Sequence, residues 1–571
     1  MICMLAAAIL ATEIPEVREI TYVPPVKVLW QTTNDGSRKV EDATRLISAR
    51  FGQVPEGEFW KGDGCLFTHN GQQPSLLLDF GRELHGGVEI GAGLYTEDKA
   101  LTKSTVQCRF RFGESVTEAM SELKENGACN GHGMRDFVAA IPSTGLRVFG
   151  DTGFRFLRID LLEPGTLQLD YVRAISKMRP LRQVGSFRSN DERLNAIFET
   201  SWRTARLCAQ KYILDGIKRD RLVWAGDMYP QIRAILAVNG PDPVIIESLD
   251  YLGTVTPPEK WMCIPSYSMF WLLGLREWWF VTGKADCLTE RRDYLKAMYA
   301  NLAKYVGLDG RCTIENAVLD WPTRKNPAAA KDGHQALFSE TFRIGGEMAR
   351  AMKETVWAEE LEALAKKTRL KGLDPHGAKS AAAMLSLYGD DDSSVKTREV
   401  LSRNGLEGLS PFFAPFVAEA RFNAGDRREA VSMMRDYWGA MLDMGATSFW
   451  EAFDVAWTNH AVRIDELAQA GRPKIHGDFG EFCYKGCRCS LCHGWGAGPS
   501  VWLIEKVLGI RFLAPGGKIV EVRPFLGDLD WIEGARALPN GESVKVRVTR
   551  ADGINVEAPD WVEVRVRDDL L

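Results

Sequence analysis

One segment of the chain concentrates ionisable side chains in a way that could serve catalysis. It reads DGIKRDRLVWAGD and holds three carboxylates and three cations: Asp215, Lys218, Arg219, Asp220, Arg221 and Asp227. Gly216 within the segment and Pro230 just after it argue against one regular amphipathic helix, so we expect a loop. Loops on a rigid scaffold often carry functional residues. The alternative is a solvated, self-neutralising loop. Trp224 and the Leu222–Val223 pair argue against full solvation and favour a site.

A second candidate is the segment from Gly445 to Glu451, where one carboxylate follows an aromatic pair. Phe449, Trp450 and Phe453 flank Glu451. We expect these rings to desolvate the carboxyl, raise its pKa and suit it to proton transfer near neutral pH. A glutamate at the rim of an aromatic core is the alternative interpretation.

Two shorter segments add polar and aromatic side chains. His493 and Trp495 lie among glycines in CHGWGAGP, which indicates a turn or a close backbone approach. Asp320 and Trp321 form another carboxylate–indole pair before Pro322, in an expected loop. A single histidine is more often structural than catalytic, so His493 alone does not define a site.

Separated carboxylates with tryptophans nearby meet the minimum for glycoside hydrolysis. One carboxyl protonates the leaving oxygen and the other activates water. The chain has no Gly-x-Ser-x-Gly elbow between a strand and a helix, and no phosphate-binding Gly-Lys-Ser/Thr loop. These patterns favour a glycosidase over a serine hydrolase or a nucleotide-binding enzyme.

Length and charge narrow the class further. The chain has 571 residues and a net charge of -5 from 71 basic and 76 acidic side chains. That length allows about two to four domains. The balanced charge gives no electrostatic reason to expect nucleic acid or an anionic membrane surface as partner. No apolar run is long enough to cross a membrane.

The pattern of the chain predicts a multidomain protein in three parts. Residues 24–184 have short runs with the strand period of two, which predict an N-terminal β-sandwich; examples are Leu76–Phe80, Val88–Ile90, Val106–Phe112 and Phe156–Leu161. Residues 509–571 return to that period at Val520–Arg523, Val544–Val548 and Val562–Val566, and predict a small C-terminal β-sandwich domain.

Between these parts, residues 185–508 have helical spacing. A capping box is expected at Ser189–Glu192, before the first helix. Later helices are predicted at Ile344–Met352, Ala358–Lys367, Lys379–Leu387 and Arg428–Met441. Many antiparallel helix pairs without a repeat signature favour a central (α/α)6 toroid over a solenoid.

Cysteines and the N-terminus give weaker signals. Cys483, Cys487, Cys489 and Cys492 lie beside His493, but their spacing matches no common closed zinc site, so we expect packed thiols and no metal. Residues 1–23 are either a signal remnant or a ragged terminus, because Met1–Ala11 is apolar and lacks a basic segment. We expect a periplasmic or secreted protein, with a cytoplasmic location as the alternative.

At these residues the chain resembles glycoside hydrolase family 78, the bacterial and fungal α-L-rhamnosidases. The resemblance extends from the β-sandwich to the C-terminus and is most specific at Asp215–Asp227. Further matching segments are Leu78–Glu83, Gly153–Phe156, Gly185–Phe187, the Ala-Thr-x-x-Trp-Glu run ending at Glu451, Ser490–Trp495 and Pro524–Leu529. The resemblance implies an exo-acting, inverting α-L-rhamnosidase that needs no redox cofactor; a calcium ion stays open as an alternative but is not indicated by the residues.

The resemblance also implies roles for single residues. Asp220 would be the general acid and Glu451 the general base, while Asp215 and Asp227 contact the sugar and His493 and Trp495 line the pocket. We add Arg219, Trp224, Asp320, Trp321 and Trp450 as expected substrate-binding residues. One departure weakens the assignment of the acid: most family members have Glu where this chain has the shorter Asp220.

Three alternatives stay open at this point. The chain could act on another sugar, or be a polysaccharide lyase with Tyr229 or His493 as base. Lys218, Arg219 or Arg221 could recognise an acidic sugar, although internal salt bridges would explain the same charges. A carbohydrate-binding homologue without turnover is the non-enzymatic alternative.

Overall fold

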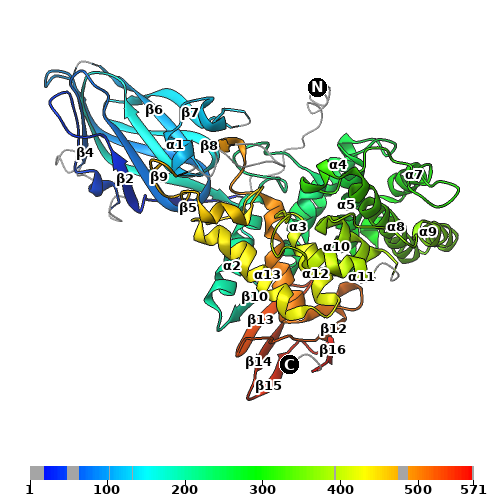
Figure 1. Ribbon diagram of the computed structural model, residues 1–571. Helices are drawn as coiled ribbons and strands as arrows, with labels where there is room; N and C mark the ends of the chain where they lie inside the picture. Colours follow the sequence, from blue (N-terminus) through cyan, green and yellow to red (C-terminus); the bar gives the residue numbers. More distant parts are fainter. Residues whose placement is uncertain are drawn as a thin grey trace.

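A computed structural model describes residues 18–47, 64–101, 103–131, 133–390, 394–472 and 486–568. The N-terminal β region lies at one side of the helices, and the C-terminal sheets lie below them (Figure 1). Residues 1–17, on which the signal-remnant hypothesis depends, lie outside the described part. No helix within the described part has both the length and the apolar composition needed to span a bilayer.

The β region forms one hydrogen-bonded sheet whose central order is β3-β4-β9-β5-β8-β6-β7, with β1 beside β9 and β2 beside β5. The bounds are β1 Glu19–Val23, β2 Lys27–Gln31, β3 Arg38–Glu41, β4 Cys65–His69, β5 Ser75–Thr96, β6 Thr105–Gly113, β7 Asp136–Pro142, β8 Gly145–Leu161 and β9 Gly165–Met178. The predicted strands 76–80 and 88–90 belong to the single strand β5. β1 begins before the predicted start of this region at residue 24.

The predicted helices are confirmed and belong to longer helices, except that α8, Pro327–Ala351, ends one residue before the predicted end. The helices are α1 Val116–Met120, α2 Glu192–Cys208, α3 Ala225–Val238, α4 Pro243–Val255, α5 Pro265–Thr282, α6 Asp286–Thr289, α7 Arg292–Ala303, α8 Pro327–Ala351, α9 Thr355–Thr368, α10 Lys379–Tyr388, α11 Ser394–Ser402, α12 Ala414–Asn423, α13 Arg427–Asp443 and α14 Gly498–Trp502. Short 3-10 segments include η4 Pro322–Lys325 and η8 Gly494–Ala497.

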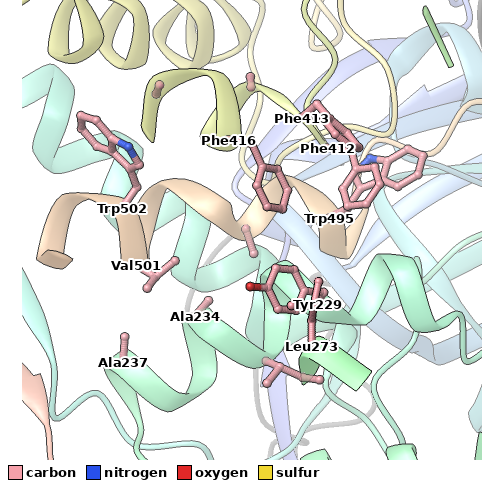
Figure 2. Packing of buried hydrophobic residues seen from close by; sticks show 14 of the residues in the cluster. Tyr229, Ala234, Ala237, Leu273, Phe412, Phe413, Phe416, Trp495, Val501 and Trp502 are labelled. Atoms are coloured by element: carbon pink, nitrogen blue, oxygen red, sulfur yellow. The ribbon is translucent and has the colours of Figure 1, made fainter. Parts of the chain in front are cut away.

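Six of these helices contact one another in a closed series. α3 packs on α5, α5 on α8, α8 on α10, α10 on α12, α12 on α14, and α14 again on α3. Figure 2 shows the apolar packing inside this series, where Tyr229 of α3 faces Phe416 of α12 and Trp502 of α14 lies nearby. The rings of Tyr229 and Phe416 are parallel, with centroids 6.1 Å apart.

The expected capping box at Ser189–Glu192 is wrong. α2 is capped by Asp191, whose carboxylate accepts hydrogen bonds from the N–H groups of Arg193 and Leu194 at 2.9 and 3.1 Å. The hydroxyl of Ser189 instead accepts from the N–H of Asp191. The difference arises because Ser189 is the last residue of a strand, β10 (Ser186–Ser189), and is therefore too far from the first helical turn.

The C-terminal part contains two sheets. One has the order β10-β13-β14-β15 and the other β11-β12-β16. The bounds are β11 Ile510–Phe512, β12 Ile519–Val522, β13 Trp531–Ala537, β14 Ser543–Thr549, β15 Gly553–Glu557 and β16 Glu563–Val566. Since β10 pairs with β13, residues just before the helices join a sheet at the other end of the chain.

Candidate active site

A cavity of about 280 Å³ lies where loops between the helices meet. Its lining brings together nine of the eleven predicted site residues: Asp215, Asp220, Trp224, Asp227, Asp320, Trp321, Glu451, His493 and Trp495. The remaining lining residues are Cys263, Ile264, Tyr267, Val318, Leu319, Phe412 and Arg324. Arg219 and Trp450 do not line it.

The loop after α2 folds back on itself to present its acidic side chains. The N–H of Asp215 donates to the carbonyl of Leu222 at 2.9 Å, and the N–H of Leu222 donates to the Asp215 carboxylate at 2.9 Å. Asp220 and Arg221 adopt the left-handed region, with φ of 61° and 51°. Non-glycine residues rarely adopt this conformation, and strained backbone of this kind often occurs at functional sites.

Arg219 connects the two predicted catalytic carboxylates. Its Nη2 donates to both carboxylate oxygens of Glu451 at 2.8 and 2.9 Å, and its Nη1 forms an ion pair with Asp220. Its Nε donates to the carbonyl of Arg488 at 2.6 Å. Arg219, which the sequence predicted to contact substrate, does not line the cavity; its buried guanidinium holds other site residues in place.

Glu451 is a buried carboxylate surrounded by donors and positive charge. Besides Arg219, the N–H of Ser490 donates to its Oε2 at 2.9 Å. Burial by itself raises the pKa of Glu451, but the positive charges of His493 and Arg219 and the Ser490 hydrogen bond outweigh it. The pKa lies below its ordinary value, so the expected upward shift is wrong. Flanking aromatic rings in the sequence did not reveal the cations that the fold brings close.

His493 and Asp227 form a second buried pair. The His493 Nε2 lies 2.8 Å from the Asp227 Oδ1. Burial lowers the pKa of His493, but the hydrogen bond to Asp227 and the nearby Glu451 and Asp215 raise it to about 9. The imidazole is therefore protonated at neutral pH.

Two groups beside this pair have raised pKa values. Burial raises the pKa of Asp215 well above its ordinary value, with His493 opposing and Asp227 adding to the increase. Burial also raises the pKa of Tyr267, as do the charge of Asp227 and a hydrogen bond to it. The cavity thus places two groups with raised pKa values, Asp215 and Tyr267, beside Glu451, whose pKa is lowered.

Aromatic side chains form one wall of the cavity. Trp495 donates its Nε1–H to the carbonyl of Glu451 at 3.1 Å and stacks on Phe412, with ring centroids 5.2 Å apart. Figure 2 shows Trp495 and Phe412 side by side at one end of the apolar cluster. Trp450, which the sequence predicted to bind substrate, does not line the cavity; it is fully buried and packs on Phe453.

Asp320 lines the cavity, but its carboxylate oxygens are engaged by hydroxyl groups. Ser380 and Thr323 donate to Oδ1 at 3.1 and 3.0 Å, and Ser410 donates to Oδ2 at 3.0 Å. Burial raises the pKa of Asp320, while these hydrogen bonds lower it and only partly offset the burial. Asp320 therefore ties the loop before α8 to α10 and to the segment before α12.

Sequence reasoning missed several lining residues. Tyr267 and Ile264 come from the start of α5, and Phe412 from the segment before α12. None of them lies in a polar motif, so only their place in the helix series reveals them. Arg324, in η4, follows the predicted Asp320–Trp321 pair by a few residues, so that pair could have drawn attention to it.

Among the described residues, no group of three or more His, Cys, Asp or Glu side chains is arranged to hold a metal ion. Cys487, Cys489 and Cys492 are buried, and Cys483 lies outside the described residues. The lyase alternative also loses one candidate base, because Tyr229 packs among Phe270 and Phe416 and does not line the cavity.

Comparison with known proteins identifies the fold. No family model and no curated protein matches the chain. Among solved structures, a family 78 rhamnosidase of Bacillus sp. GL1 matches with a TM-score of 0.73 and 20% identity, covering 92% of this chain and 55% of that chain. The chain has the fold of the glycoside hydrolase family 78 rhamnosidases.

Two further family 78-like matches agree. An α-L-rhamnosidase from Dictyoglomus thermophilum matches with a TM-score of 0.68 and 15% identity, over 96% of this chain and 59% of that chain. A Klebsiella oxytoca rhamnosidase with rhamnose bound matches with a TM-score of 0.63 and 18% identity, over 86% and 96%. The chain thus spans a little over half the length of the first two proteins.

Proposed function

We propose that this protein is an exo-acting, inverting α-L-rhamnosidase that removes terminal α-L-rhamnose from a glycoside or oligosaccharide. One observation carries the proposal: Asp220 and Glu451, from distant segments, line the same cavity and contact the same arginine. The fold shared with rhamnosidases supports rhamnose as the sugar. We infer further that the helices form an (α/α)6 toroid, which the closed series from α3 to α14 supports.

Glu451 has the properties of a general base. Its lowered pKa keeps it ionised. An ionised carboxylate has about four acceptor sites, and the hydrogen bonds from Arg219 and Ser490 use one on Oε1 and two on Oε2. Oε1 therefore keeps a site that can take the proton of an attacking water.

Asp220 is the proposed general acid. It lines the cavity, and the strained backbone at residues 220–221 fixes its place there. An inverting enzyme needs the acid and the base on opposite faces of the sugar, with room for water between base and sugar. His493 and Trp495 would contact the sugar beside Glu451. We expect no cofactor to take part.

The experiment that tests this proposal is hydrolysis of 4-nitrophenyl α-L-rhamnopyranoside. We expect turnover by the wild type and a loss of at least about 100-fold in kcat for Asp220→Asn and for Glu451→Gln, since general acid–base catalysis contributes about 10²–10⁴-fold. Circular dichroism should show that both variants fold. NMR of the first product should show β-rhamnose, whereas α-rhamnose would contradict inversion.

Other outcomes would redirect the proposal. Activity that survives Asp220→Asn would move the acid role to another cavity carboxyl, with Asp215, whose pKa is raised by burial, as the next candidate. Binding of rhamnose without turnover of any rhamnoside would favour a carbohydrate-binding homologue.

A further inference from the structure

We propose that the open side of the cavity binds a carboxylate on the sugar next to the terminal rhamnose, and that Arg324 recognises it. The ligand class is thus a rhamnosyl uronate. This inference rests on the proposed function, because it specifies the leaving group of that reaction.

Arg324 is the exposed cation of the cavity. It lies in η4, lines the cavity, and its guanidinium carbon is 4.9 Å from the centroid of the Trp321 ring. Stacking on an indole holds a guanidinium while leaving its edge open to a ligand. In the described part of the chain, no carboxylate lies within ion-pair distance of Arg324.

The other cations close to the catalytic carboxylates are already neutralised. Lys218 contacts Glu114 and Glu118 at 3.0 and 3.2 Å. Arg219 is paired with Glu451 and Asp220. Arg221 donates to the carbonyl of Asp151 at 2.7 Å and lies 3.4 Å from its carboxylate. These three residues are therefore poor candidates for binding an acidic sugar, and we assign that role to Arg324.

Charge also separates the two ends of the cavity. At the buried end, Arg219 is paired with Glu451 and Asp220, and His493 is paired with Asp227, so these cations are already engaged by protein carboxylates and a neutral terminal sugar fits there. An exo-acting enzyme places the terminal sugar at the closed end of its pocket and directs the next sugar toward solvent. The exposed Arg324 lies on that open side, and its planar fork matches a carboxylate in bidentate geometry.

The test compares two disaccharides that differ in one group. These are α-L-rhamnosyl-(1→4)-D-glucuronate and its carboxyl-reduced counterpart, α-L-rhamnosyl-(1→4)-D-glucose. We expect the wild type to favour the uronate by about tenfold in kcat/KM, as one exposed charge-assisted contact would give. Arg324→Gln should reduce this ratio to near one, and Arg324→Glu should reverse it. Because each ratio is measured within one protein, a misfolded fraction cannot produce the change.

Arg428→Gln is the matched control, since Arg428 is exposed on α13 away from the cavity. It should keep the wild-type ratio. Raising the ionic strength should lower the preference of the wild type. The aryl rhamnoside, run in parallel, separates this inference from the proposed function. Two results would overturn this inference alone while the aryl rhamnoside is still cleaved. One is an equal kcat/KM of the wild type for both disaccharides. The other is a kcat/KM ratio in Arg324→Gln that is unchanged from the wild type. No cleavage of any rhamnoside overturns both.

Discussion

At the scale of single residues, the central feature is the guanidinium of Arg219 between Asp220 and Glu451. It is buried, donates to both oxygens of Glu451, and pairs with Asp220. A guanidinium in this position fixes the geometry of the proposed base and stabilises its charged form. The pH dependence of the reaction should therefore depend on this residue.

We expect Arg219→Gln to lower kcat by about 100-fold, the loss that follows when a reacting group is misplaced by about an ångström. We also expect the acidic limb of the kcat/KM profile to move upward by about 1 pH unit, because loss of the positive charge raises the pKa of Glu451. A stopped assay with the aryl rhamnoside between pH 3 and 8 measures both. A fall in kcat with an unmoved acidic limb would show that Arg219 does not set the charge of Glu451.

His493 allows a prediction about stability. Its pKa in the folded protein is about 9, against an ordinary value of 6.5 in the unfolded chain. A raised pKa means that the folded state binds the proton more tightly, so this contribution is fully present below pH 6.5 and is lost as pH rises through 9. The shift corresponds to about 2–4 kcal/mol.

We therefore expect the free energy of unfolding to differ more between wild type and His493→Gln at pH 6 than at pH 9.5. Urea titrations at both pH values measure this difference. His460→Gln is the control, because His460 is exposed and its substitution should change the free energy of unfolding by less than about 0.5 kcal/mol. A constant difference across this range would contradict the charged state of His493.

At the scale of elements, a buried ion cluster joins the β region to the loops of the active site. Lys218, next to Arg219, contacts Glu114 and Glu118 and donates to the carbonyls of Cys487 and Cys489 at 2.8 and 3.0 Å. These carbonyls belong to the segment whose Ser490 N–H donates to Glu451. The same segment is held by the Leu491 N–H, which donates to Glu114 at 2.6 Å.

Lys218→Met should destabilise the protein strongly. Removing one partner of a buried ion pair typically costs about 3–5 kcal/mol, because the remaining charges lose their compensation. Here burial already raises the pKa of Glu114 to about 7. Urea unfolding measures the change. Lys396→Met, at the exposed Lys396–Asp374 pair, is the control and should change stability by less than about 1 kcal/mol. Equal effects of the two substitutions would contradict a structural role for the buried cluster.

At the scale of the whole molecule, the β region and the helical region share buried polar contacts in two further places. Arg155 of β8 pairs with Asp79 of β5 and donates to the carbonyl of Gly445, at the start of the segment that leads to Glu451. The N–H of Glu83 donates to the hydroxyl of Thr447 at 2.8 Å. The β region thus supports the segment that carries the proposed base.

We expect these two regions to unfold together. Separating them would expose Arg155 and leave Lys218 without its carboxylate partners, so neither region gains from unfolding alone. Differential scanning calorimetry of the full chain should show one main transition that includes the β region. Two transitions separated by tens of degrees would show that the regions are independent.

The sequence by itself determined the classes of elements and the identity of most site residues. Helical spacing marked Ala358–Lys367 and Lys379–Leu387, and period-two runs marked Val106–Phe112, because these patterns depend only on which side chains one element buries. The dense polar loop from Asp215 to Asp227 was recognisable because carboxylates between tryptophan and glycine are unusual in a purely structural loop.

Only the tertiary structure decided how these residues act. Neighbours in sequence suggested that aromatic rings raise the pKa of Glu451, but Arg219 and His493, distant in the chain, lower it. Trp450 is next to Glu451 in sequence, yet its ring is buried in the core, and Phe412 reaches the cavity without any polar motif in the sequence. Electrostatic and packing environments are set by residues that folding brings together. A local sequence pattern therefore identifies a site's residues better than their charge or their partners.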